Sequence, residues 1–113
     1  DTLDTTEKIY DYNIALISAR YYNNSKKLIF KVFIDNTGNQ NDAVSCNFKL
    51  LDKENNIIKE FNEQSVTVQQ SETYVYYFTY QTIERPAKGE YFIEAASSTE
   101  TAAKYQKEKF IMR

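Results

Sequence analysis

Carboxylates are the side chains of this sequence whose chemistry could support catalysis, because a glycosidase needs only two of them at a defined separation. The candidates are Asp35, Asp42, Asp52, Glu54, Glu84, Glu90 and Glu94. Nearly all fall in predicted turns or on polar faces, where a carboxylate is ordinarily solvated. The chain contains no histidine, which excludes Ser-His-Asp and Cys-His arrangements. We therefore expect no enzymatic activity.

Cys46 is the only cysteine of the chain, so it has no partner for an intrachain disulfide, and a multi-cysteine zinc site is excluded. It alternates with Val44, Phe48 and Leu50 along one apolar face, where burial disfavours the thiolate. We expect Cys46 to be a buried, unreactive thiol.

Two oxygen-rich loops, DNTGNQND (residues 35–42) and DKENN (residues 52–56), carry the hard ligands that calcium prefers. Neither loop has the spacing of an EF-hand, and Asn and Asp are also the residues that simple turns require. We expect no cofactor, with calcium at one of these loops as the alternative. The two glycines, Gly38 and Gly89, lie too far apart to form a glycine-rich phosphate loop.

Charge and hydropathy exclude several kinds of partner. The chain carries 14 basic and 16 acidic residues, for a formal net charge of −2, without a long block of like charge, so we expect no nucleic-acid partner. Its apolar runs are about four residues long, far below the roughly 20 that a membrane span requires, so we expect no membrane insertion by this segment. Because the sequence begins with Asp1, we expect a mature product or a domain of a longer protein.

Alternation with a period of two dominates from Ile9 onward and predicts β-strands. In the segment KLIFKVFID, four apolar side chains share one face, while Lys31 and Asp35 lie on the other. The four predicted core residues are Leu28, Phe30, Val32 and Ile34. The polar stretch NTGN then ends the strand, and we expect Gly38 to take a positive φ there.

Similar segments recur at the spacing of about 8–12 residues that antiparallel sandwiches show. We predict an all-β fold, an immunoglobulin-like antiparallel β-sandwich of about seven strands, in residues 9–113. Residues 1–8 are polar and aperiodic, and we predict a flexible lead-in or linker. Residues 99–109 have a composition that favours a helix, but we expect a turn and a final strand there.

The segment RPAKGEY (residues 85–91) predicts a crossover loop that ends in a tyrosine corner. In immunoglobulin-like sandwiches, a tyrosine near the start of the penultimate strand donates its hydroxyl to backbone a few residues upstream. Tyr91 occupies this position, Gly89 allows the sharp turn before it, and Pro86 keeps the loop out of the ladder. The alternative is an ordinary tyrosine at the start of a strand.

Several apolar and aromatic side chains fall on predicted outward faces. A patch of this kind marks a contact with a protein partner or a sugar, unless a loop or a neighbouring domain covers it. The candidate partner-contact residues are Phe33, Val75, Tyr77 and Phe92.

The order of these features resembles the CARDB modules and the related domains of archaeal surface-layer proteins, which share fibronectin III-like β-sandwiches. The motifs are FIDNTG (residues 33–38), FKLLDKENNII (48–58), VTVQQSETYVYYFTY (66–80) and PAKGEYFIEA (86–95). Ser71 stands where the pattern usually has a glycine. The resemblance implies a sandwich with a surface or spacer role and supplies no catalytic residues.

We expect a non-catalytic extracellular or cell-surface module, located in a prokaryotic envelope, that contacts a protein partner or neighbouring domains. Its role would be adhesion, surface-layer structure or spacing within a larger protein. Two alternatives remain. One is a carbohydrate-binding module that uses exposed tyrosines, and the other is an accessory or inhibitor domain of a secretion or motility assembly.

Overall fold

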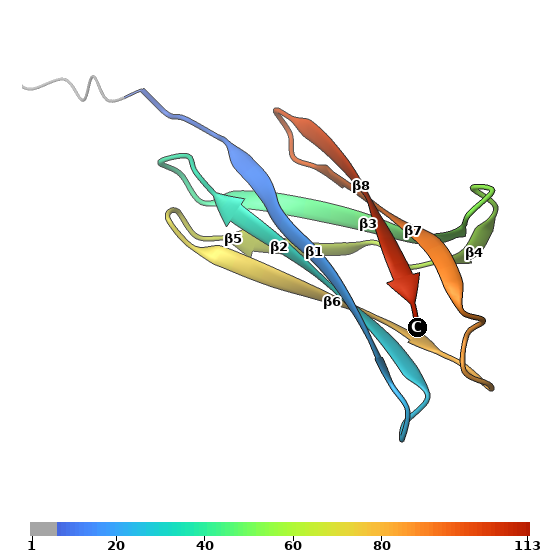
Figure 1. Cartoon of the computed structure of the whole chain (residues 1–113). Coiled ribbons are helices and arrows are strands. Elements are labelled where there is room, and N and C mark those ends of the chain that lie inside the picture. The colour runs from blue at the N-terminus through green and yellow to red at the C-terminus, as the bar shows by residue number, and fades with distance from the viewer. Residues whose placement is uncertain (1–6) are drawn as a thin grey trace, which may run out of the picture.

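The computed structural model describes residues 7–113, apart from the side chain of Leu16. These residues form eight strands and no helix (Figure 1). All strand pairs are antiparallel, which confirms the predicted all-β sandwich. The strands are β1 (Tyr12–Tyr22), β2 (Lys27–Asn36), β3 (Asp42–Asp52), β4 (Ile57–Glu60), β5 (Gln64–Val68), β6 (Thr73–Gln81), β7 (Gly89–Ser98) and β8 (Ala103–Met112).

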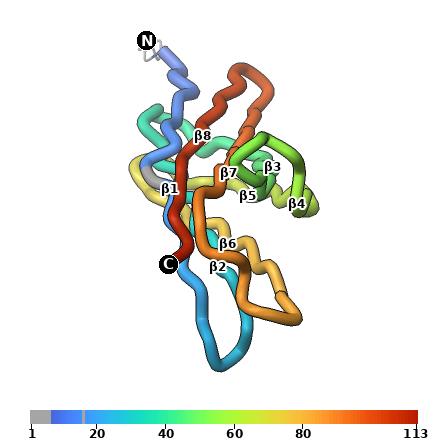
Figure 2. Tube along the Cα trace, turned by 45° about the vertical axis from the view of Figure 1, so that its right-hand side comes forward, coloured from blue at the N-terminus to red at the C-terminus, as the bar shows by residue number. Residues whose placement is uncertain are grey.

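The strands are divided between two sheets. The first sheet has the order β1-β2-β6, and the second has the order β4-β3-β7-β8, with β5 also paired to β3. The chain therefore crosses between the sheets after β2, β5 and β6. Strands β1 and β8, from different sheets, pass close to each other (Figure 2). Within residues 7–113, no helix is long and apolar enough to cross a membrane.

The core lies between the sheets and follows the predicted alternation. Leu28, Phe30, Val32 and Ile34 are at most 1% exposed, and the intervening side chains of β2 are only half-buried. Phe48 of the second sheet stacks on Phe78 of the first, with ring centroids 4.8 Å apart. Close aromatic packing of this kind stabilises a core beyond the area that it buries.

Gly38 does not have the positive φ that we predicted, so that prediction is wrong. Its role is close packing: a Cβ on Gly38 would lie 2.2 Å from the Ile9 carbonyl oxygen. The Gly38 N–H donates to the Asp11 carbonyl at 3.0 Å, and the Asn39 N–H donates to Ile9 at 2.9 Å. The segment before β1 is thus bonded to the loop after β2.

The predicted lead-in, residues 1–8, lies outside the described residues except for Glu7 and Lys8. The Asn39 side-chain amide donates to the Glu7 carbonyl at 2.7 Å.

Three non-glycine residues take the left-handed backbone conformation in turns: Lys26, Asn55 and Ser71. Ser71, with a φ of 63°, lies between Gln69 and Glu72, whose backbones are hydrogen-bonded at 3.1 Å. The turn therefore keeps the geometry that glycine favours even though serine occupies the position.

Candidate interaction surface

The outer face of the first sheet brings together three of the four predicted contact residues. In the register of β2 and β6, Phe33 lies opposite Val75, and Lys31 lies opposite Tyr77. Paired residues of antiparallel strands share a face, so these four side chains are neighbours. Tyr77 is 55% exposed, and Phe33 and Val75 are half-buried. The result is a partly apolar strip that points away from the core.

Two cations lie over tyrosine rings on this same face. The Lys31 ammonium is 5.6 Å from the centre of the Tyr77 ring. On β1, the Arg20 guanidinium is 5.1 Å from the centre of the Tyr22 ring. Both separations fall within the range of a cation–π interaction. The face is therefore a mixture of aromatic and basic side chains.

Phe92, the fourth predicted contact residue, is not part of this strip. It belongs to β7 of the second sheet, where its register partners are Leu51 and Lys109. Leu51 is buried on this outer side, and the Lys107 ammonium lies 4.8 Å from the centre of the Phe92 ring. Phe92 thus packs with its own sheet and lies on the opposite side of the sandwich from Tyr77.

Tyr91 and Gly89 have the geometry of a tyrosine corner. The Tyr91 hydroxyl donates a 2.6 Å hydrogen bond to the Ala87 carbonyl, four residues upstream. Gly89 has a φ of 137°, in a region that side chains with a Cβ rarely adopt. The hydroxyl bond and the glycine together fix the turn from the β6–β7 loop into β7.

The candidate carboxylates of the described residues lie in different surroundings. No group of three or more His, Cys, Asp or Glu side chains among these residues is placed to hold a metal ion. Asp52 accepts hydrogen bonds from the backbone of Glu54 and Asn56, which hold the pKa of its carboxyl below the usual value, the Asn56 bond most strongly. The Asp52 carboxylate therefore stabilises the turn that follows β3.

Asp42 differs because it is buried and its Oδ2 has no hydrogen-bond partner among residues 7–113. Burial raises the pKa of this carboxyl, the Ala43 N–H opposes the shift, and the nearby Glu100 adds to it. One buried carboxylate is far short of the roughly six to eight oxygen ligands that calcium takes.

Cys46 is buried on the core side of β3. Burial raises the pKa of its thiol to about 12, so the reactive thiolate is scarce near neutral pH. The placement agrees with an unreactive structural cysteine.

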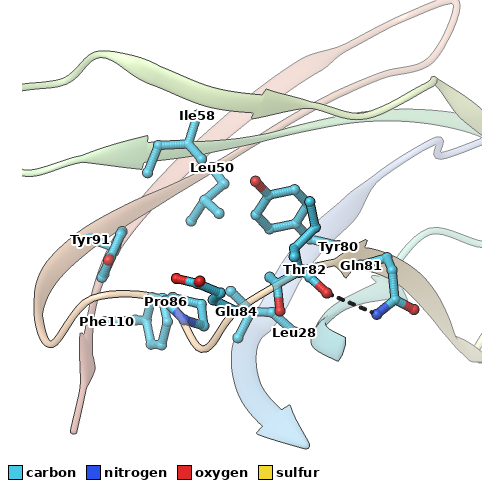
Figure 3. Close-up of a pocket in the computed structure, with 11 residues that line it drawn as sticks. Leu28, Leu50, Ile58, Tyr80, Gln81, Thr82, Glu84, Pro86, Tyr91 and Phe110 are labelled. Atoms are coloured by element: carbon cyan, nitrogen blue, oxygen red, sulfur yellow. Dashed lines mark hydrogen bonds between the residues drawn. The ribbon is translucent and has the colours of Figure 1, made fainter. Parts of the chain in front are cut away.

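A cleft that the sequence analysis missed opens at the end of the sandwich where β6 leads into β7 (Figure 3). It has a volume of about 610 Å³. Tyr80 and Pro86 line its walls, and Leu50 and Phe110 reach it from the second sheet. Ile83, in the loop at its edge, is 88% exposed. The signal in the sequence was this large apolar side chain in the β6–β7 loop.

Comparisons with known proteins place the fold. No protein-family model matches the chain, and no curated protein sequence matches it either. Among solved structures, it is similar to the CARDB domain of a Pyrococcus furiosus protein, solved in complex with di-metal ions. The identity is 16% and the TM-score 0.58, over 82% of this chain and 77% of that one. The fold of the present chain is that of a CARDB domain. The predicted resemblance is thus confirmed at the level of the fold.

Two further matches show a similar fold in chains of different length. A Bordetella pertussis protein described as ApaA is 19% identical, with a TM-score of 0.58, over 93% of this chain and 94% of that one. Beta-glucosidase 3B of Thermotoga neapolitana is 14% identical, with a TM-score of 0.58. The match covers 92% of this chain but only 16% of the glucosidase. The fold of this chain therefore matches nearly the whole of one protein and a small part of a large enzyme.

Proposed function

We propose that this domain is a non-catalytic interaction module of a larger extracellular or cell-surface protein, and that it contacts a protein partner through the outer face of the first sheet. The observation that carries the proposal is the apolar strip of Phe33, Val75 and Tyr77. An exposed tyrosine beside half-buried apolar side chains is typical of a protein contact surface.

The rigidity of the sandwich supports this role. Strand β2 is the central strand of the first sheet, and its inner side chains are buried against the second sheet. Phe33 of the strip therefore lies on a strand that is paired on both edges, and Val75 and Tyr77 lie on the neighbouring strand β6, which is paired to β2 along one edge. A contact surface on paired strands of this kind loses little conformational entropy when a partner binds.

The surroundings of the carboxylates support a non-catalytic role that needs no cofactor. A glycosidase requires two carboxyl groups on opposite sides of one substrate bond, whereas Asp52 is bonded within a turn and Asp42 is buried.

The partial match to a glucosidase fits an accessory domain attached to other domains. A lone buried cysteine, with no disulfide to stabilise the domain, is compatible with the prokaryotic envelope that we propose as its location.

Carbohydrate binding is the second candidate, and the aromatic rings of the strip favour it. Tyr77 and Tyr22 lie on the same face and are 55% and 37% exposed, so each offers part of a ring on which a sugar could stack. A glycan array distinguishes the candidates. Binding to a neutral glycan that is lost in Tyr77→Ala would support the carbohydrate reading and contradict the protein-contact reading.

A photo-crosslinking experiment tests the main proposal. The residue p-benzoylphenylalanine is placed at position 77 of the full-length protein in the producing cell, and in a matched control at position 105. Tyr105 is 60% exposed but lies on β8 of the second sheet, where its hydroxyl bonds Glu94. We expect a discrete protein adduct from position 77 and none from position 105. The purified partner should then bind wild type and Tyr105→Ser, but not Tyr77→Ser. Equal adducts at both positions, or none at position 77, would contradict the proposal.

A further inference from the structure

The outer face of the first sheet carries more positive than negative charge. Its ionised side chains come from β1 and β2, since β6 contains no charged residue. Three are basic and one is acidic: Arg20, Lys27, Lys31 and Asp35. The acidic one, Asp35, lies at the far end of β2, where it accepts a hydrogen bond from the Thr73 hydroxyl at 3.1 Å. Around Lys27 and Lys31 the face is basic, although the chain as a whole has a net charge of −2.

The cations of this face also differ from other cations in their partners. Residues 7–113 form four ion pairs, and none of them includes Arg20, Lys27 or Lys31. They are Lys49–Glu60, Lys104–Asp11, Lys107–Glu94 and Lys109–Glu90. Four lysines of the second sheet thus have carboxylate partners, whereas Lys59 of β4 lies over the Phe61 ring. On the first sheet, Arg20 and Lys31 lie over tyrosine rings, which leave their charge available to an incoming anion.

The basic residues on the outer side of β2 have a regular spacing. On the outer side, cationic and apolar residues alternate in the order Lys27, Ile29, Lys31, Phe33. Each step of two residues spans about 6.6 Å, so the two lysines stand about 13 Å apart. An extended peptide has the same repeat of about 3.3 Å per residue. Successive side chains of an extended peptide point to opposite sides. One side of the peptide would therefore match this row if its acidic side chains are four residues apart, with an apolar side chain midway between them.

We infer that the partner contacts this face through an acidic, extended polypeptide segment whose sheet-facing side chains, at every second residue, alternate between carboxylates and apolar groups. The inference rests on the proposed function and specifies the chemistry of its partner. The carboxylates face Lys27, Lys31 and Arg20, and the apolar side chains pack on Ile29, Phe33 and Tyr77. Charge complementarity of this kind sets the specificity and the rate of association.

Fluorescence anisotropy with synthetic peptides tests the inference on the whole domain. The probe is a labelled peptide of sequence Glu-Ser-Val-Ser-Glu-Ser-Val-Ser-Glu, which presents Glu and Val in turn on one side when extended, and the control probe replaces each Glu by Gln. We expect the acidic peptide to bind at least about 10-fold more tightly than the neutral one, and its advantage to shrink as salt is raised. Equal binding of both peptides, or no binding of the acidic one, would overturn the inference.

Charge-reversal variants test the location. Lys27→Glu/Lys31→Glu should weaken the acidic peptide at least about 10-fold, because it replaces two attractions by repulsions. The matched control is Lys53→Glu/Lys88→Glu, which changes the net charge equally at exposed loop lysines that lie beside Gly89 of the second sheet. It should change the affinity by less than about 2-fold. Equal losses in both double variants would show non-specific attraction and overturn the inference.

Binding of other anions tests whether the ligand is a polypeptide, and the crosslink distinguishes failure of this inference from failure of the proposed function. A polyuronate or a single-stranded oligonucleotide that binds this face in place of the peptide would overturn the polypeptide assignment. A crosslinked partner at position 77 together with no binding of the acidic peptide would leave the proposed function intact and reject this inference alone. Absence of an adduct at position 77 would reject the proposed function itself.

Discussion

The Tyr76 hydroxyl of β6 donates a 2.6 Å hydrogen bond to the Val44 carbonyl of β3 and so joins the two sheets through the core. Burial is the main cause that raises the pKa of Tyr76 far above its ordinary value, so the hydroxyl stays protonated and able to donate. Tyr91 makes a bond of the same length to Ala87, but near the surface. If the hydroxyl is removed, water can reach the Ala87 carbonyl at the surface but not the Val44 carbonyl in the core.

Removal of the Tyr76 hydroxyl should therefore cost more stability than removal of the Tyr91 hydroxyl. We expect Tyr76→Phe to lower the free energy of unfolding by about 1–3 kcal/mol, because the buried Val44 carbonyl loses its donor, and Tyr91→Phe by about 1 kcal/mol or less. Urea denaturation measures both. Equal losses would mean that the inter-sheet bond has no special contribution.

The two glycines should respond to alanine in different ways. In Gly38→Ala, the new Cβ would overlap the Ile9 carbonyl, so we expect the hydrogen bonds from residues 38 and 39 to Asp11 and Ile9 to break. In Gly89→Ala, nothing lies within 4 Å of the added Cβ, and the cost is the strained φ, about 1–3 kcal/mol. Amide exchange measured by NMR should accelerate at Asn39 in the first variant only. Protected Asn39 in Gly38→Ala would contradict the close-packing role.

Asp42 should make the stability depend on pH. Its pKa is raised in the folded state by burial, so the folded protein binds more protons than the unfolded one between the unfolded pKa of about 3.9 and the higher folded pKa. The contribution of Asp42 to stability is therefore present below pH of about 4 and is lost as the pH rises through the folded pKa.

Asp42→Asn should consequently gain stability relative to wild type as the pH rises. We expect the difference in unfolding free energy to favour the variant more at neutral pH than at a pH of about 3. Denaturation curves across this range measure it, with Asp52→Asn as the control, since the pKa of Asp52 is shifted in the opposite direction. A difference that stays constant with pH would contradict the prediction.

The thiol of Cys46 should be inert in the folded protein. With its pKa raised to about 12 by burial, almost no thiolate exists at a pH of about 8, and reagents cannot reach it. An Ellman assay should show little reaction in native wild type and complete reaction in denaturant. Cys46→Ser/Ala103→Cys, with a new thiol at the exposed start of β8, should react quickly while folded. Fast reaction of native wild type would contradict the burial.

The strands and their buried faces could be predicted because alternation is a local property. Leu28 and Phe30 are two residues apart, so their common face follows from strand geometry without knowledge of any other strand. The final strand was also predicted, even though residues 99–109 favour a helix, because the apolar residues at its end suited a sheet. Tertiary pairing with β7 overrides that helix preference.

The arrangement of the strands in space could not be predicted in the same way. Phe33 and Phe92 were both placed correctly on outward faces, but periodicity does not say which sheet a strand joins, and they lie on opposite sheets. The role of Gly38 depends on Ile9, which approaches it only in the folded chain. The end cleft likewise requires the relative position of Tyr80, Pro86 and Phe110.

NMR mapping of the bound partner tests the contact face most directly. The isotope-labelled domain is titrated with the purified partner identified through the crosslink at position 77, and the changes in amide chemical shift are compared between the sheets. We predict the largest changes in residues 29–33 of β2 and 75–79 of β6, with little change along β7 and β8. Changes concentrated on β7 and β8, or in the loop at residues 82–88, would contradict the account.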